Sequence, residues 1–504
     1  MPAFLFVSIP LHGHLWPATC VAKALAARLE PGSSVTFAGL EGSRAVVEAQ
    51  GLAFASLGEL PPAAAAALAA AASVLDGGGA GDLRSAAATA MGPAYFSTYL
   101  SVMAPPLLRL ITGDATLPTA GAAAAASSLS TTPNYDVIVA DHATLAGYAA
   151  AEALALPLAV LQQMPLSYGL ALSGHAAYNA PAAVPVELPG AVLPERMGLW
   201  ARLVANRRLK AARLAEILAA YDAALGPARA ALGLPPRAPG AAPYEIPTPA
   251  PRGAVLNGAP PELEVPRAAL PPGWAMTGPQ GIDDYVASFP PPLPRGGGGG
   301  GDASEASDAS EARIAAFLDK AEAEGLPVVY VALGTLARLD GRGVAAMAGA
   351  FAANSGAARF VWSLPKPQQA LLPDGLDTAA ILVTPWAPQA ALLAQPAVRL
   401  FVTHAGLNST AEALAAGKPM LALPFFADQG INAQHIENRR LGAQMAPGKM
   451  SAASLGALVA KLLADGGLAS RAAAAGACAR RAGGGAAAAA ALLKFAAGGG
   501  ARST

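Results

Sequence analysis

The feature that most constrains the fold is a regular alternation in the second half of the chain. Short apolar runs rich in β-branched residues take turns there with helical patterns. The runs are PVVYVALG (327–334), RFVWSL (359–364), AILVTPW (380–386), VRLFVTH (398–404) and PMLALP (419–424), and helical patterns cover 390–394, 408–416, 429–441 and 451–464. Strands that alternate with helices predict a parallel sheet with helices on both faces. Such sheets bind ligands at the carboxyl ends of their strands.

The first half of the chain begins in the same way. The run FLFVSIP (4–10) leads through the loop LHGHLWP (11–17) into a helical pattern over 18–29, and the runs SVTFAG (34–39) and DVIVAD (136–141) follow. We therefore predict an α/β protein with two facing, doubly wound Rossmann-like domains and a site in the cleft between them. No G-x-G-x-x-G pattern follows the first strand, which disfavours a dehydrogenase.

The strongest domain boundary is PPPLPRGGGGGGDASEASDASEAR, residues 290–313. A proline run gives way there to consecutive glycines and then to an acidic, serine-rich stretch. Nothing in it can bury a core, so we predict a flexible linker. The predicted N-terminal domain is 1–289 and the predicted C-terminal domain is 314–480, followed by an Ala- and Gly-rich segment, 481–504.

Composition limits the classes of partner. Hydrophobic residues make up 54% of the chain and charged residues 13%, which excludes wholesale disorder. Lys and Arg together number 33, as do Asp and Glu, so the chain has no net formal charge. Because a protein that binds a phosphate backbone needs a basic surface, nucleic acid is not an expected partner.

Cysteine content and the apolar stretches bear on location. Cys20 and Cys478 are the only cysteines, too few for a disulfide framework or a cysteine-rich zinc module, which fits a reducing compartment. The apolar run that begins at Phe4 leaves no room for a charged leader. The stretch 145–161 is interrupted by a glutamate and a proline. We expect a cytoplasmic monomer with no membrane span.

The segment 386–429 carries side chains suited to a nucleotide sugar. The strand that ends at His404 runs through Gly406 into a helix whose first turn holds Asn408 and Ser409, residues that suit a helix N-cap. A helix N-terminus presents backbone N–H groups and a partial positive charge, which predicts a diphosphate site. Gly406 lets a phosphate approach the backbone, and His404 can donate to a phosphate oxygen.

Side chains at neighbouring strand ends suit the rest of such a ligand. Trp386 offers a flat face on which a base could stack, a contact worth about 1 to 3 kcal/mol. Glu412, on the helix face of Asn408, can accept hydrogen bonds from ribose hydroxyls, and Asp428 with Gln429 can bind sugar hydroxyls. Base, ribose, diphosphate and hexose can thus be laid across successive strand ends.

This segment resembles the donor-binding signature of the family 1 UDP-glycosyltransferases, and it has the length of the signature box of the plant enzymes. The patterns W-x-P-Q, F-V-T-H-x-G-x-N-S-T-x-E, G-x-P and P-x-x-x-D-Q match in order. The resemblance implies a GT-B fold and an inverting transfer of a hexose from a UDP-sugar to a hydroxyl of a small lipophilic acceptor. It implies no metal and no cofactor beyond the UDP-sugar as co-substrate.

The resemblance also implies a role for each residue at a matching position. These are Trp386, Ala387 and Gln389 for the nucleoside, Glu412 for the ribose, Thr335, His404, Gly406, Asn408 and Ser409 for the diphosphate, and Asp428 and Gln429 for the sugar. Gln429 is the residue associated with glucose donors. Three positions depart from the plant pattern: Leu407 replaces Trp, Ala405 replaces Cys and Gln395 replaces His. Leu407 changes the sugar-side wall of the pocket.

A sugar transfer to an alcohol needs a base near the acceptor hydroxyl, and histidine titrates in the right range. The resemblance assigns this role to the histidine of the G-H pair after the first strand, His14. Its partner should be a carboxylate that orients the imidazole and stabilises its charged form. Asp141 ends the strand DVIVAD, and a family aspartate follows a similar strand. We therefore predict a catalytic dyad of His14 and Asp141.

The other histidines have simpler interpretations. His12 and His14 could ligate zinc, but no third ligand stands nearby, so we predict no metal site. We interpret His142 as a loop residue lining the cleft, and His175 and His435 as partly exposed structural residues.

Other functions stay open on the sequence. One is a sugar-nucleotide-binding protein without turnover, which the retention of both His14 and Asp141 disfavours. Another is a different enzyme of the same fold, such as a nucleotide-sugar epimerase or a peptidoglycan-type transferase, which the complete signature disfavours. The acceptor has no readable motif, because the stretches 60–130 and 165–290 are rich in alanine and proline.

Overall fold

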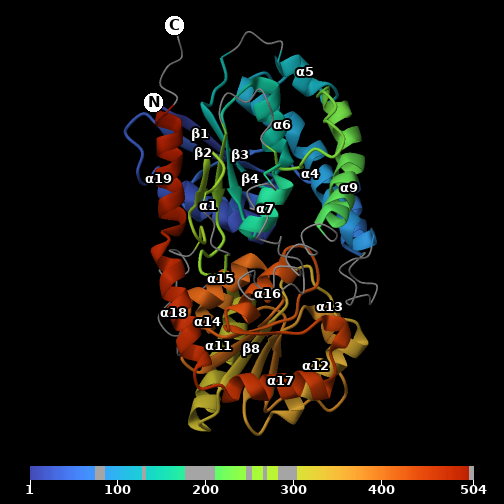
Figure 1. Cartoon of the computed structure of the whole chain (residues 1–504), viewed down its shortest axis with the longest axis vertical. Coiled ribbons are helices and arrows are strands. Elements are labelled where there is room, and N and C mark those ends of the chain that lie inside the picture. Colours follow the sequence, from blue (N-terminus) through green and yellow to red (C-terminus); the bar gives the residue numbers. More distant parts are fainter. Residues whose placement is uncertain are drawn as a thin grey trace.

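Two parallel sheets, each with helices around it, make up the chain. The computed structural model describes residues 1–73, 86–127, 132–175, 210–245, 253–264, 269–281 and 304–498. In Figure 1 the N-terminal sheet with β1 lies in the upper domain and the C-terminal sheet with β8 in the lower one. This is the predicted α/β architecture with two domains.

The N-terminal sheet has seven parallel strands in the order β3-β2-β1-β4-β5-β6-β7. The strands are β1 Ala3–Val7, β2 Ser34–Gly39, β3 Ala53–Ser56, β4 Val137–Asp141, β5 Leu158–Gln162, β6 Gly253–Asn257 and β7 Trp274–Met276. The helices around it are α1 His12–Ala26, α2 Arg44–Glu48, α3 Pro62–Ser73, α4 Ala86–Thr112, α5 Ala122–Ser127, α6 Leu145–Leu154, α7 Leu166–Leu172 and α9 Lys210–Leu232. Within β1, Phe4 lies opposite Val35 of β2 and Val137 of β4.

The C-terminal sheet has six parallel strands in the order β10-β9-β8-β11-β12-β13. They are β8 Val328–Ala332, β9 Arg359–Ser363, β10 Ile381–Thr384, β11 Val398–Thr403, β12 Met420–Ala422 and β13 Gly442–Gln444. The helices in this half of the chain are α11 Ser304–Ala323, α12 Gly341–Ala353, α13 Lys366–Gln369, α14 Gln389–Ala394, α15 Leu407–Ala415, α16 Gln429–Asn438, α17 Ala452–Ala464, α18 Leu468–Arg481 and α19 Gly484–Ala497, the last of which packs on the other domain. The first five of these strands are the ones predicted from the sequence.

Each sheet buries both of its faces, as the nearly continuous apolar strands require. In β1, Leu5 and Val7 join a core with α4, α6 and α9, whereas Phe4 and Phe6 join a second core with α1. The C-terminal sheet divides in the same way between a core with α12 and α17 and a core with α11, α14, α15 and α16.

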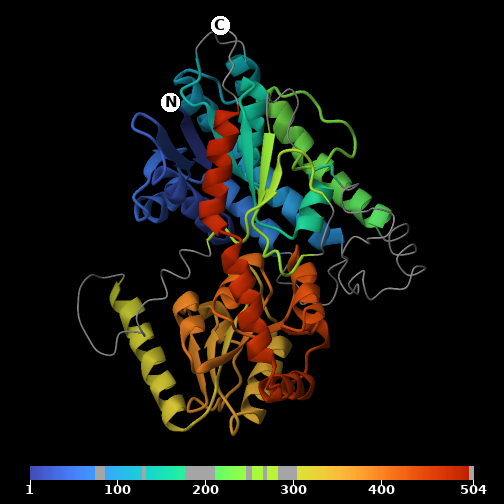
Figure 2. The ribbon, with the colours of Figure 1, turned by 60° about the vertical axis from the view of Figure 1, so that its left-hand side comes forward.

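The last two helices connect the domains. Figure 2 shows α18 beside the lower domain and α19 continuing along the upper one. Helix α18 packs against α15, and α19 packs against α1. Ala488, Ala489 and Leu492 of α19 are fully buried in the same core as Phe4 and Leu25. Helix α19, which lies in the predicted Ala- and Gly-rich C-terminal segment, therefore completes the core of the N-terminal domain.

Two local predictions were wrong. Residues 304–313 of the predicted linker form the first half of α11, because their alanines and glutamates favour a helix; the rest of the linker lies outside the described residues. The predicted loop 11–17 is mostly helix, since α1 begins at His12 and contains Pro17. A proline usually marks a helix boundary, which is why the pattern suggested a later start.

No single described helix has the length and apolar character to cross a bilayer. Ala452–Ala464 together with Leu468–Ala497 satisfies those two criteria only as a pair, bent by 77°.

Candidate active site

The predicted site residues gather at the points where the strand order of each sheet reverses. In the N-terminal sheet the order turns between β1 and β4, and His14 and Asp141 follow or end these strands. In the C-terminal sheet it turns between β8 and β11, which lead to Thr335 and His404. Loops diverge at such a switch point and leave room for a ligand. The topology therefore places two half-sites, one on each domain.

The predicted dyad forms. His14 Nδ1 lies 2.9 Å from Asp141 Oδ1, and the side chains are 19% and 1% exposed. His14 lies in the first turn of α1, where its backbone N–H bonds Leu11 O at 2.8 Å. Asp141 is the last residue of β4, so the sheet fixes the carboxylate while the imidazole reaches toward solvent.

The second oxygen of Asp141 is held by its own turn. Asp141 Oδ2 accepts hydrogen bonds from the backbone N–H of Ala143 at 3.1 Å and from Thr144 Oγ1 at 3.0 Å. Thr144 Oγ1 in turn accepts from the backbone N–H of Ile9 at 2.9 Å, in the turn between β1 and α1. Thr144 thus links the carboxylate to the segment that carries His14, a role that no sequence pattern indicated.

The pKa values of the two dyad residues are shifted in opposite directions. Burial alone would lower the pKa of His14, but the charge and hydrogen bond of Asp141 outweigh it and the pKa is raised. Burial alone would raise the pKa of Asp141, but the charge and the hydrogen bond of His14 oppose it, and the pKa is lowered. The carboxylate is therefore ionised, and His14 Nδ1 donates its proton to it, which leaves Nε2 as the basic nitrogen.

His142 is a buried neighbour of the dyad and not a loop residue lining an open cleft. Its Nδ1 lies 3.2 Å from Asp141 Oδ1 and accepts a hydrogen bond from the backbone N–H of Gln163 at 3.2 Å. Burial lowers the pKa of His142 despite the charge of Asp141, so the ring is neutral. The ligand atoms of His14, Asp141 and His142 lie within 4.8 Å of one another, so the fold brings beside His14 further potential metal ligands that the sequence did not reveal.

The C-terminal half-site is built around His404. Its imidazole packs against Gly334 and Gly406, where a Cβ would lie 2.8 Å and 2.5 Å from ring atoms. Burial lowers the pKa of His404 to about 4, so the ring is neutral and offers a hydrogen bond but no charge. The ring fits because neither glycine has a Cβ. Gly334 also has a φ of +75°, which favours glycine.

Helix α15 begins beside this ring without a side-chain cap. Its N-cap is Gly406, not Asn408, and the N-cap makes no side-chain hydrogen bond to the backbone N–H groups of the first turn. The predicted cap was wrong because the extended Gly406 backbone (φ −60°, ψ 146°) starts the helix at Leu407. Asn408 and Ser409 lie within the first turn, so its N-terminal backbone N–H groups can bind an anion.

The residues predicted to hold a nucleoside surround this helix. Gln389 Nε2 donates to Glu412 Oε2 at 2.9 Å and to Ser409 Oγ at 3.1 Å. Trp386 is 53% exposed just after β10, whereas the next residue, Ala387, is buried. Thr335 follows β8 on the exposed surface. An exposed tryptophan at a strand end is unusual, and its free face suits an aromatic ligand.

Asp428 and Gln429 lie at the start of α16. Asn432 Nδ2 donates to Asp428 Oδ2 at 2.9 Å, and Gln429 Oε1 accepts from the backbone N–H groups of Phe425 and Phe426 at 2.8 and 3.1 Å. Burial raises the pKa of Asp428 to about 6, although the Asn432 hydrogen bond and the charge of His14 oppose it.

One hydrogen bond joins the half-sites directly. Asn408 Nδ2 donates to the backbone oxygen of Gly13 at 2.8 Å. Gly13 immediately precedes His14, so the N-terminal turns of α1 and α15 meet at the domain boundary.

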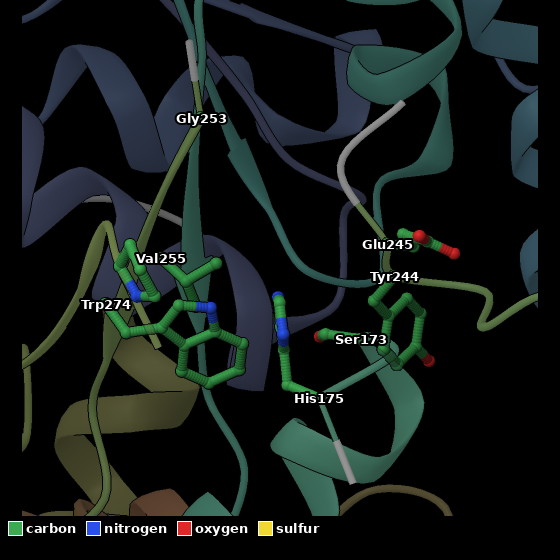
Figure 3. Close-up of a pocket in the computed structure, with 8 residues that line it drawn as sticks. Ser173, His175, Tyr244, Glu245, Gly253, Val255 and Trp274 are labelled. Carbon is green, nitrogen blue, oxygen red and sulfur yellow. The ribbon is translucent and has the colours of Figure 1, made fainter. Parts of the chain in front are cut away.

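The remaining histidines and the cavity lie outside these half-sites. His435 is buried, so the expectation of partial exposure was wrong, whereas His175 is partly exposed and its ring lies 5.6 Å from that of Trp274. A cavity of about 170 Å³ includes His175 in its wall, and Figure 3 shows the ring between Trp274 and Tyr244. No predicted site residue lines this cavity, although Tyr244 also contacts His142.

Solved structures define the class of fold. The glycotransferase of kitacinnamycin matches with a TM-score of 0.58 at 20% identity, over 98% of this chain and 99% of that one. The glycosyltransferase SnogD from Streptomyces nogalater matches with a TM-score of 0.55 at 22% identity, over 98% and 99%. The chain thus has the two-domain GT-B fold of glycosyltransferases.

Sequence comparisons match only part of the chain. Residues 283–468 match the family described as UDP-glucoronosyl and UDP-glucosyl transferase. An anthocyanidin 3-O-glucosyltransferase of Zea mays is 40% identical over 153 residues, 29% of this chain and 32% of that protein. UDP-glycosyltransferase 76H1 of Stevia rebaudiana is 40% identical over 132 residues, 24% and 30%. The matches span about a third of these relatives' length.

Proposed function

We propose that the chain transfers a hexose from a UDP-sugar to a hydroxyl of a small lipophilic acceptor, with inversion at the anomeric carbon. The observation that carries this proposal is the junction of the two half-sites. A hydrogen-bonded imidazole–carboxylate pair on one domain lies near the N-terminus of α15 on the other, and a hydrogen bond from Asn408 to Gly13 joins the two domains there.

The geometry supports a single displacement. His14 Nε2 takes the proton of the acceptor hydroxyl while the acceptor oxygen forms a bond to the anomeric carbon. The bond from that carbon to the diphosphate oxygen breaks, and UDP leaves toward α15. The lowered pKa of Asp141 keeps a negative charge beside the imidazolium that forms. The proton thus passes from acceptor to His14, and the leaving charge rests on UDP.

The donor is proposed to lie along the C-terminal half-site. Trp386 would stack on uracil, Glu412 and Gln389 would hold the ribose and base, and Asp428 with Gln429 would hold the sugar, with glucose favoured. The backbone N–H groups of α15 and the neutral His404 would bind the diphosphate, which supports transfer without a divalent cation.

The acceptor is proposed to be a planar phenol. The printed names of the relatives include anthocyanidin and flavonol glucosyltransferases. Phe96 of α4 meets the His14 ring edge-on at 6.3 Å, and Tyr95 meets Phe96 at 6.2 Å, so aromatic rings flank the base. Such walls favour flat aromatic ligands.

The direct test is a screen of UDP-glucose and UDP-galactose against phenols, flavonoids and sterols, with and without EDTA. Product formation read by mass spectrometry, together with stoichiometric UDP release, is the expected result, unchanged by the chelator. UDP binding without turnover across the panel would instead support a binding protein. Loss of turnover in EDTA would refute transfer without a metal.

Trp386→Ala is expected to weaken UDP binding by about 1 to 3 kcal/mol, because the exposed ring loses its stacking on the base. Isothermal titration calorimetry with UDP measures this. Trp274→Ala is the matched control, since this tryptophan lines the cavity outside the half-sites. Equal UDP affinity in wild type and Trp386→Ala would show that the base lies elsewhere.

A further inference from the structure

Helix α1 contains a proline, Pro17, at a position where a backbone N–H would normally donate a helical hydrogen bond. In an α-helix the carbonyl of Gly13 accepts from the N–H four residues later, which here is Pro17, and proline has no N–H. An interior proline destabilises a helix, yet α1 continues through Pro17 to Ala26. A residue that disfavours the secondary structure in which it lies is expected most often at a functional site.

The Gly13 carbonyl, which receives no hydrogen bond from Pro17, accepts one from a side chain of the other domain. Asn408 Nδ2 lies 2.8 Å from Gly13 O. A Cβ built on Gly13 would lie 3.5 Å from the same nitrogen, so the amide of Asn408 lies directly on this turn. The proline ring also crowds the carbonyl four residues before it, which disfavours the in-line helical orientation.

Both ends of this hydrogen bond carry site residues. Gly13 adjoins His14, and Asn408 belongs to the first turn of α15, the turn proposed to bind the diphosphate. A shift between these turns would change the distance from the base to the sugar. Reacting groups must be held within a fraction of an ångström, so such a shift is costly.

We propose that Pro17 is a positioning residue: it reserves the Gly13 carbonyl for Asn408, and this bond sets His14 relative to the N-terminus of α15. The inference rests on the proposed function, since positioning matters only if sugar is transferred between the half-sites. It assigns Asn408 a contact across the domain boundary in addition to any contact with the donor.

Pro17→Ala tests the proposal, because alanine at this position restores the backbone N–H that competes for Gly13 O. We expect an unchanged or higher Tm, an unchanged Kd for UDP and a kcat about tenfold lower. A merely structural role would lower Tm and kcat together. Pro227→Ala is the matched control, since Pro227 is an exposed proline inside α9, and it should leave kcat at the wild-type value.

A double-mutant cycle locates the effect. In an Asn408→Ala background, Pro17→Ala should change kcat by less than about twofold, since the bond through which it acts is already lost. The same tenfold loss in both backgrounds, or no loss in wild type, would overturn the proposal. Pro17→Ser restores the same N–H and replaces Pro17→Ala if that variant does not fold.

The cycle is also run on Tm, which needs no turnover. An inactive wild type would refute the proposed function, and the Tm cycle would then decide whether Pro17 and Asn408 interact. Additive Tm changes would show that they do not and would overturn the inference. Non-additive Tm changes would support the interaction between Pro17 and Asn408 but not a role in sugar transfer.

Discussion

His14→Ala is expected to lower kcat by about 10²- to 10⁴-fold, because the acceptor hydroxyl loses its base. The affinity for UDP should stay close to that of wild type, since His14 lies on the half-site opposite α15. Steady-state kinetics with a saturating donor and calorimetry with UDP measure the two quantities separately.

His12→Ala is the matched control for this variant. His12 is exposed, two residues from His14, and stacks on Trp16 at a centroid distance of 6.0 Å. We expect it to transfer sugar at nearly the wild-type rate. An equal loss of kcat and of UDP affinity in His14→Ala would contradict the assigned role and indicate a structural effect of the substitution.

Asp141→Asn is expected to lower kcat by about 10²- to 10³-fold at neutral pH, because no charge then stabilises the imidazolium. It should also move the pH profile. The base works when deprotonated, so kcat/KM of the wild type falls as the pH drops through the raised pKa of His14, above the ordinary value of about 6.5. Without the charge of Asp141, burial dominates and lowers that pKa, and the acid limb moves below this value.

The measurement is kcat/KM against pH for both proteins, with Tm recorded because Asp141 is buried. Asparagine is nearly isosteric, and its oxygen can still accept from Ala143 and Thr144. Asp114→Asn, on a surface turn, serves as the control and should leave the profile unchanged. An acid limb that stays in place in Asp141→Asn would mean that another group titrates in it.

Much of the C-terminal domain could be predicted from the sequence. Its strands are continuous β-branched runs, and runs such as PVVYVALG have few alternatives to a buried parallel strand. The dyad was predictable for a related reason: His14 and Asp141 follow strands whose carboxyl ends meet at one edge of the sheet. The family resemblance named these two residues, and the topology brings them together at 2.9 Å.

The sequence could not predict features that depend on contacts distant along the chain. His142 and Thr144 look like ordinary turn residues in the sequence. In the fold, His142 accepts from the N–H of Gln163, just after β5, and Thr144 accepts from the N–H of Ile9, just after β1. Pro17 suggested a helix boundary because the donor that compensates its missing hydrogen bond comes from Asn408. Residues 304–313 suggested a linker by composition, but they continue into the second half of α11, where Ile314, Leu318 and Ala321 are buried in a core.

The place of α19 has a consequence for how this chain is made. Proteins grow from the amino end, and domains generally fold in that order as they leave the ribosome. Here the core around Phe4 and Leu25 is closed by Ala488, Ala489 and Leu492, which follow the whole C-terminal sheet along the chain. The first domain to emerge is therefore finished only after the second has been made, and one of its apolar faces stays uncovered until α19 has left the ribosome.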